Sequence, residues 1–112
     1  MDAKTRSNFK KILIKALDEI DRAERDTKAD RAPVELDQQS VGRLSRMDAM
    51  QVQAMAEAQS RRRATERVRI TAALARFGAD EFGYCQSCGE EIERKRLELD
   101  PATPFCVGCA QR

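Results

Sequence analysis

The sequence predicts a mainly α-helical protein, in which a long antiparallel helical hairpin is followed by a small cysteine-rich module. Two long segments carry apolar residues at helical spacing, and two pairs of cysteines lie close together near the end of the chain. The 112 residues are 36% charged and 41% hydrophobic, with four Phe, one Tyr and no Trp, so a thick globular core is not expected. We place the hairpin at residues 1–78, with its turn near 31–40, and the module at residues 79–112.

The first helix is predicted from Lys4 to about Arg31. This segment contains no Gly or Pro, and opposite charges four residues apart, such as Asp18 and Arg22, support its exposed face. One stripe of the helix is apolar, with residues spaced close to i, i+3/i+4 and i+7. The stripe consists of Phe9, Leu13, Ala16, Leu17, Ile20, Ala23 and Thr27.

The second helix is predicted from near Ser40 to about Phe77. Pro33 separates it from the first helix, Asp37 or Ser40 can cap its start, and Gly78 follows its end. We expect its stripe to pack against the first, as a coiled coil about 40 Å long. A larger helical bundle is the alternative, but too few apolar residues remain to build one. The expected stripe is Val41, Leu44, Met47, Gln51, Met55, Ala58, Thr65, Val68 and Ala72.

The C-terminal module contains two C-x2-C pairs, Cys85 with Cys88 and Cys106 with Cys109, separated by seventeen residues. Two cysteines on one tight turn can direct both sulfurs at one ion, and two such turns complete a zinc tetrahedron with bonds of about 2.3 Å. Four thiolates leave no open coordination position, so we predict one structural Zn²⁺. Two disulfides, a thioredoxin-like redox pair and an iron centre on the same sulfurs are the alternatives.

Several apolar side chains are available to cover this C4 zinc-finger module. Between the cysteine pairs, Ile92, Leu97, Leu99 and Phe105 are expected to pack around the metal. Phe82 and Tyr84 precede the first pair, and we expect them to pack against the base of the hairpin. Gly89 and Gly108 are expected to let the two cysteine turns bend.

The composition excludes several classes of function. Without histidine there is no imidazole for acid–base catalysis or for a Ser-His-Asp triad, and we predict that the protein is not an enzyme. No apolar run approaches the ~20 residues that span a bilayer, and the N-terminal residues lack a secretory apolar region. We therefore expect a cytoplasmic protein without a membrane partner. A net charge of +2 does not favour sequence-independent DNA binding.

The cysteine module resembles the zinc finger of a known family. The stretch Phe82-Gly83-Tyr84-Cys85-Gln86-Ser87-Cys88-Gly89-Glu90-Glu91-Ile92 resembles the start of the C4 finger of the DksA/TraR family. Arg96-Leu97 and Pro104-Phe105-Cys106-Val107-Gly108-Cys109 resemble its second half, and the preceding hairpin matches the family's layout. The sequence looks like a short member of this family.

The resemblance implies a monomeric regulator of transcription. Proteins of this family bind RNA polymerase and insert their coiled coil into its secondary channel, where they modulate initiation together with guanosine tetraphosphate, without contacting a specific DNA sequence. The alternative is a zinc ribbon that binds nucleic acid directly. Residues 79–112 carry seven acidic and four basic side chains, a net charge of −3 that repels phosphates, so we prefer the first hypothesis.

The tip of the hairpin departs from the family pattern D-x-x-D-x-A. The candidate tip residues here are Asp37, which lies near the expected turn, and Asp48, which is followed directly by Ala49. A helix cap or a surface charge is the alternative role for either aspartate. The basic run Arg61–Arg63 is expected to circle the second helix, and we assign no alarmone site to it.

Overall fold

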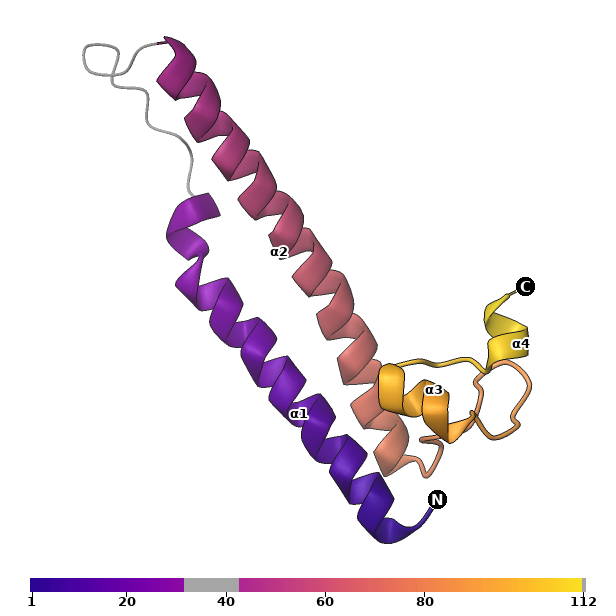
Figure 1. The fold of residues 1–112 in the computed structure, drawn as a ribbon. Helices are drawn as coiled ribbons and strands as arrows, with labels where there is room; N and C mark the ends of the chain where they lie inside the picture. The colour runs from indigo at the N-terminus through magenta and orange to yellow at the C-terminus, as the bar shows by residue number, and fades with distance from the viewer. Residues whose placement is uncertain (32–42, 112) are drawn as a thin grey trace.

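The computed structural model describes residues 1–31 and 43–111 of the chain. Helix α1 (Ala3–Asp26) is followed by the short 3-10 helix η1 (Lys28–Arg31), the long helix α2 (Arg43–Gly78), α3 (Arg94–Leu99) and α4 (Val107–Ala110). The molecule is elongated, with extents of 64 × 29 × 20 Å, and α1 runs antiparallel to α2 (Figure 1). The predicted fold class, a helical hairpin followed by a small cysteine module, is confirmed. Among the described helices, none is both long and apolar enough to cross a membrane.

Helix α1 begins and ends at side-chain caps. The carboxylate of Asp2 accepts a hydrogen bond from the backbone N–H of Thr5 at 2.7 Å. At the other end, the hydroxyl of Thr27 donates to the carbonyl of Ala23 at 2.6 Å, and the chain tightens into η1. The α-helix is therefore shorter than the predicted segment, because its last turn, which ends at Arg31, is a 3-10 helix.

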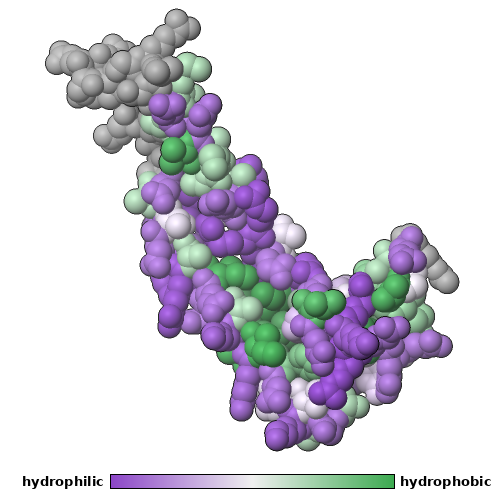
Figure 2. All heavy atoms as spheres, in the orientation of Figure 1, coloured by the Kyte–Doolittle hydropathy of each residue, from purple (hydrophilic) through white to green (hydrophobic). Residues whose placement is uncertain are grey.

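The interface between α1 and α2 changes character along its length. Near the base, Phe9 and Leu13 of α1 lie buried in the same cluster as Ile70 and Ala73 of α2. On the face shown in Figure 2, the strongly hydrophobic side chains gather mostly over this lower half and the adjoining cysteine module. The hairpin is therefore held by apolar packing near the cysteine module.

Farther from the base, the interface is polar and centres on Glu24. Its carboxylate accepts hydrogen bonds from Arg63 at 2.6 Å and from Ser60 at 3.0 Å, and it lies 3.3 Å from the Arg31 guanidinium. The pKa of Glu24 is lowered, chiefly by the hydrogen bond from Arg63. Burial acts in the opposite direction, whereas the Ser60 hydrogen bond and the Arg31 charge lower the pKa further. Ion pairs thus take the place of apolar packing in this part of the hairpin.

Over the side chains that the structure describes, which do not include Val41 and Leu44, the apolar stripe predicted for α2 is wrong. Met47, Met55 and Val68 are 53%, 64% and 70% exposed, whereas Ile70 and Ala73 are buried. Apolar residues occur on more than one face of α2, and the face toward α1 includes the polar residues Ser60 and Arg63. Periodicity alone could not show which of these faces meets α1.

Aromatic side chains join the hairpin to the cysteine module. The ring of Phe82 stacks on that of Phe77 with centroids 4.0 Å apart, and the Phe9 ring lies 5.9 Å from Phe82 in a tilted contact. The prediction that Phe82 packs against the base is confirmed. Tyr84 is 43% exposed and lines a hollow with Thr5 and Arg6, so it contributes less to this packing than the sequence predicts.

Candidate metal centre

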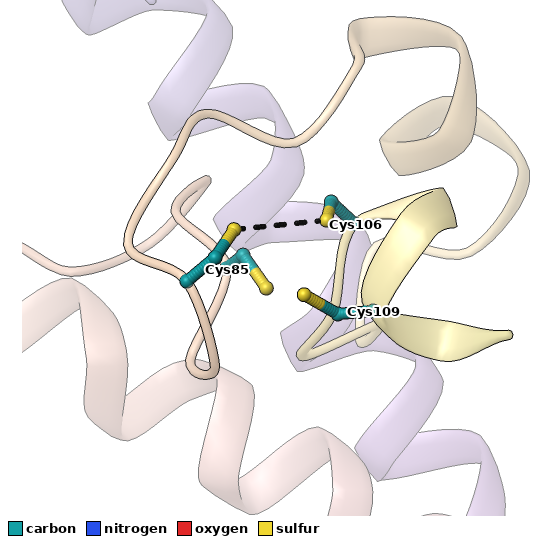
Figure 3. A group of neighbouring side chains, drawn as sticks. Cys85, Cys106 and Cys109 are labelled. Carbon is teal, nitrogen blue, oxygen red and sulfur yellow. Dashed lines mark hydrogen bonds between the residues drawn. The ribbon is translucent and has the colours of Figure 1, made fainter. Parts of the chain in front are cut away.

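The structure brings the four predicted cysteines together in one cluster. The sulfur atoms of Cys85, Cys88, Cys106 and Cys109 all lie within 4.8 Å of one another. Figure 3 shows the side chains of Cys85, Cys106 and Cys109 converging on a common region. The Sγ atoms of Cys88 and Cys106 are 3.8 Å apart, the edge of a tetrahedron whose metal–sulfur bonds are about 2.3 Å. The cluster fits one structural zinc ion.

The first cysteine pair lies on a turn closed by backbone hydrogen bonds. The N–H of Gly89 donates to the Cys85 carbonyl at 2.9 Å, and the N–H of Cys85 donates to the Glu90 carbonyl at 2.8 Å. Gly89 has φ 78°, a left-handed conformation that glycine adopts without steric cost. The N–H of Ser87 lies 3.4 Å from the Cys85 sulfur and favours its thiolate. Gly89 therefore lets this turn bend, as predicted.

The second pair lies at the start of a short helix. Cys106 precedes α4, and its carbonyl accepts the N–H of Ala110 at 2.9 Å. Gly108 lies within this helix and is not among the positive-φ residues, so the expected need for glycine there is not found. A backbone hydrogen bond from Gln86 to the Pro104 carbonyl at 2.8 Å ties the two cysteine turns together.

The electrostatics of the cluster call for a cation. Burial opposes ionisation of Cys85, but N–H groups of Cys88 and Cys106 are among the backbone donors that outweigh it and lower its pKa to about 6. At Cys88 the N–H of Glu90 favours the thiolate, yet the adjacent sulfurs, Cys85 foremost, and burial raise the pKa to about 12. The pKa of Cys109 is also raised, chiefly by Cys106. The Cys85 sulfur is thus readily ionised, and a positive ion would favour the thiolates of Cys88 and Cys109.

Only part of the predicted apolar cover is found. Leu97 and Ile92 are buried, as expected, whereas Leu99 is 89% exposed and Phe105 is 40% exposed. Leu97 and Leu99 are two positions apart on α3, which places them about 200° apart around the helix, so they cannot both face inward. Phe105 accompanies the turn into Cys106 and remains partly in solvent.

Two arginines of α2, which sequence reasoning missed, fasten the loop that precedes the second cysteine pair. Buried Arg76 donates hydrogen bonds to the carbonyls of Ala102 and Thr103 at 3.3 and 3.4 Å. Arg69 donates to the carboxylate of Asp100 at 2.5 Å. The sequence offers one signal for Arg76, a lone cation within the apolar run Ala72–Phe77.

The predicted tip residues lie far along the chain from the cluster. Asp48 is exposed on α2 and Ala49 beside it is half-buried. Asp37 lies outside the described residues, as does the turn predicted near 31–40 apart from Arg31. In the basic run, Arg61 and Arg62 are exposed, whereas Arg63 forms an ion pair with Glu24. Among the described residues, neither Asp48 nor the basic run lies near the metal centre (Figure 1).

Comparison with known proteins identifies the cysteine module. A family model described as the prokaryotic dksA/traR C4-type zinc finger matches residues 80–112. The RNA polymerase-binding transcription factor DksA of Haemophilus influenzae is 46% identical over 41 residues, which cover 37% of this chain and 28% of that protein. The protein of the same name from Escherichia coli K12 is 42% identical over 41 residues, again 37% of this chain and 27% of the relative.

A solved structure extends the likeness to the hairpin. The structure of transcription factor DksA2 from Pseudomonas aeruginosa matches with a TM-score of 0.76, at 20% sequence identity, over 99% of this chain and 84% of that chain. The sequence matches to the curated relatives span less than a third of their length, while the structural match covers 99% of this chain. Residues 80–112 therefore match the DksA/TraR C4-type zinc finger, and the chain as a whole is DksA-like in fold.

Proposed function

We propose that this chain is a cytoplasmic transcription regulator that binds RNA polymerase. The observation that carries the proposal is a narrow helical hairpin, fixed to a C4 zinc finger, whose fold matches that of DksA2 over 99% of the chain. Curated relatives of the finger are named RNA polymerase-binding transcription factors. The finer part of the proposal is that the hairpin enters the secondary channel as a monomer, with guanosine tetraphosphate as a second effector.

The shape of the molecule suits such a role. In this proposal residues 1–78 reach into the polymerase and residues 79–112 set the direction of the hairpin at its base. Phe82 packs on Phe77 and Phe9, and Arg76 holds the carbonyls of Ala102 and Thr103, so the finger contacts both helices. When bound, zinc supplies the cross-link between the two cysteine turns.

The exposed carboxylate of Asp48 is a candidate for contact with the polymerase near the far end of the hairpin. Asp37, which the sequence places near the turn, is the second candidate, and Ala49 accompanies Asp48. Its place close to the break at Pro33 favours Asp37, whereas the described structure supports Asp48 only through its exposure and its place near the start of α2. Each aspartate is therefore replaced in a variant of its own.

The test measures polymerase binding and in vitro transcription for the unmodified chain, Asp37→Asn and Asp48→Asn. Glu19→Gln, an exposed carboxylate on α1, serves as the matched control. We expect the unmodified chain to bind polymerase, and at least one tip variant to lose its transcriptional effect while binding is retained. Parallel loss of binding and effect would remove the special role of the tip. Binding to duplex DNA, with none to polymerase, would favour the alternative of a nucleic-acid-binding zinc ribbon.

A further inference from the structure

The first half of α1 has an unbalanced charge. Residues 3–17 contain five basic side chains and no acidic one. The remainder of α1 and η1, residues 18–31, mixes both signs, with six acidic and four basic residues. Since the net charge of the whole chain is only +2, this segment concentrates positive charge near the base of the hairpin.

The positive charge of this segment is mostly unpaired. Within this segment, Arg6 forms an ion pair with Asp80 at 3.0 Å. The arginines of α2 also form ion pairs, but with carboxylates outside this segment. The remaining basic residues of the segment are exposed lysines: Lys4, Lys10, Lys11 and Lys15. Within residues 1–31 and 43–111, no carboxylate lies within ion-pairing distance of these lysines. Their charges are available to a partner.

Three of these lysines form a row along α1. At about 100° per residue, Lys4, Lys11 and Lys15 fall within an arc of about 40°, and we call them the lysine stripe. The stripe lies on the side of the helix opposite the buried residues Phe9 and Leu13. It is bordered by an isoleucine on each side, since Ile12 and Ile14 fall at about 80° from its centre in opposite directions.

The two isoleucines give this face an apolar border. Ile12 and Ile14 are 52% and 50% exposed. A β-branched side chain contributes to binding when it meets apolar groups, which a phosphate backbone does not offer. Isoleucines beside a row of lysines therefore favour a protein partner over a nucleic acid.

The neighbourhood of the stripe adds a second argument against nucleic acid. Asp2, which caps α1, and Arg6 in its first turn line a hollow with Asp80, Glu91 and Glu93 of the finger, and the stripe lysines are not among the lining residues. These carboxylates would repel phosphates near the N-terminal end of α1. A protein surface can place separate groups opposite the lysines and the carboxylates.

We propose that the lysine stripe, together with Ile12 and Ile14, is a docking surface for an acidic protein patch with apolar side chains, carried by RNA polymerase. This inference rests on the proposed function and adds a contact at the base of the hairpin, distant from the tip. The lysines provide attraction and orientation, and the isoleucines provide apolar contact.

The test combines Lys4→Gln, Lys11→Gln and Lys15→Gln in one variant. Glutamine keeps the helix propensity and removes the charge. The matched control is Lys28→Gln with Lys95→Gln, two exposed lysines outside the stripe. We expect the stripe variant to bind bacterial RNA polymerase core enzyme about tenfold more weakly, with a smaller dependence of Kd on salt, and the control to bind like the unmodified chain. Circular dichroism and zinc content should be equal in all three proteins.

A second variant, Ile12→Gln with Ile14→Gln, separates a protein partner from a nucleic acid. It should also weaken binding to the polymerase, whereas affinity for a short fluorescent DNA duplex should not change. If the unmodified chain binds polymerase and the lysine variant binds equally well, the inference is wrong and the proposed function stands. If the unmodified chain does not bind polymerase, both fail. If the lysine variant loses only affinity for the duplex, the surface belongs to nucleic acid and the inference is overturned.

Discussion

Replacement of Phe82 by alanine is expected to separate the finger from the hairpin. The Phe82 side chain is 3% exposed, stacks on Phe77 at 4.0 Å between centroids and contacts Phe9, so it joins both helices to the finger. Truncation of a buried phenylalanine to alanine costs about 3–5 kcal/mol, because apolar burial is lost and a cavity remains. A domain of this size has a total stability of about 5–15 kcal/mol, so the loss is a large share of it.

A milder substitution separates the loss of ring stacking from the loss of buried apolar volume. Phe82→Leu keeps most of the buried apolar volume and loses the ring stacking, so a smaller cost of about 1 kcal/mol is expected. Leu99→Ala is the matched control, because Leu99 is 89% exposed and its truncation should change the free energy of unfolding by less than about 0.5 kcal/mol.

Urea unfolding of the zinc-saturated proteins, followed by circular dichroism, measures these differences. The expected order of stability is unmodified chain and Leu99→Ala, then Phe82→Leu, then Phe82→Ala. If Phe82→Ala unfolds within 1 kcal/mol of the unmodified chain, the aromatic contact does not hold the finger to the hairpin and the reasoning is refuted.

Three further predictions concern the metal, the buried arginine and the hairpin interface. Cys88→Ser should release zinc and loosen the finger while most of the helical circular dichroism remains; metal analysis and spectra check this, and a collapse of helicity would contradict it. Arg76→Met leaves the carbonyls of Ala102 and Thr103 without this donor, and should cost about 1–3 kcal/mol in urea unfolding; an unchanged midpoint would show that the contact is dispensable. The pKa of Glu24 is lowered on folding, so its ion pair stabilises the protein above the ordinary value of 4.5 and is lost as the pH falls through the lower folded value. Unfolding curves of Glu24→Gln should therefore lie below those of the unmodified chain at neutral pH and approach them in acid; a constant gap would argue against the assigned pair.

The metal centre was the part of the molecule most accessible to sequence reasoning. Two C-x2-C pairs constrain four sulfurs through local turns, and these turns form from short-range hydrogen bonds such as the one between Gly89 and Cys85. The first helix was accessible for a similar reason, because its apolar residues, including the buried Phe9 and Leu13, follow a single face.

The second helix shows what local patterns leave undetermined. Its contact with α1 includes Arg63 and Ser60, whose polar side chains are satisfied by Glu24 across the interface. Such a pairing depends on a residue 36 to 39 positions away, so no window of α2 alone could reveal it. Arg76 was missed for the same reason, since its carbonyl partners lie 26 and 27 positions away.

The change from apolar to polar contacts along the hairpin has a consequence for its dynamics. Packed side chains such as Ile70 and Ala73 resist local opening, whereas ion pairs around Glu24 exchange readily with water. Amide hydrogens of α1 should therefore exchange with solvent more slowly around Leu13 than around Glu24. We therefore expect the hairpin to be rigid next to the finger and more easily bent near Glu24, so that its outer part can adapt to a partner while its base keeps a fixed orientation.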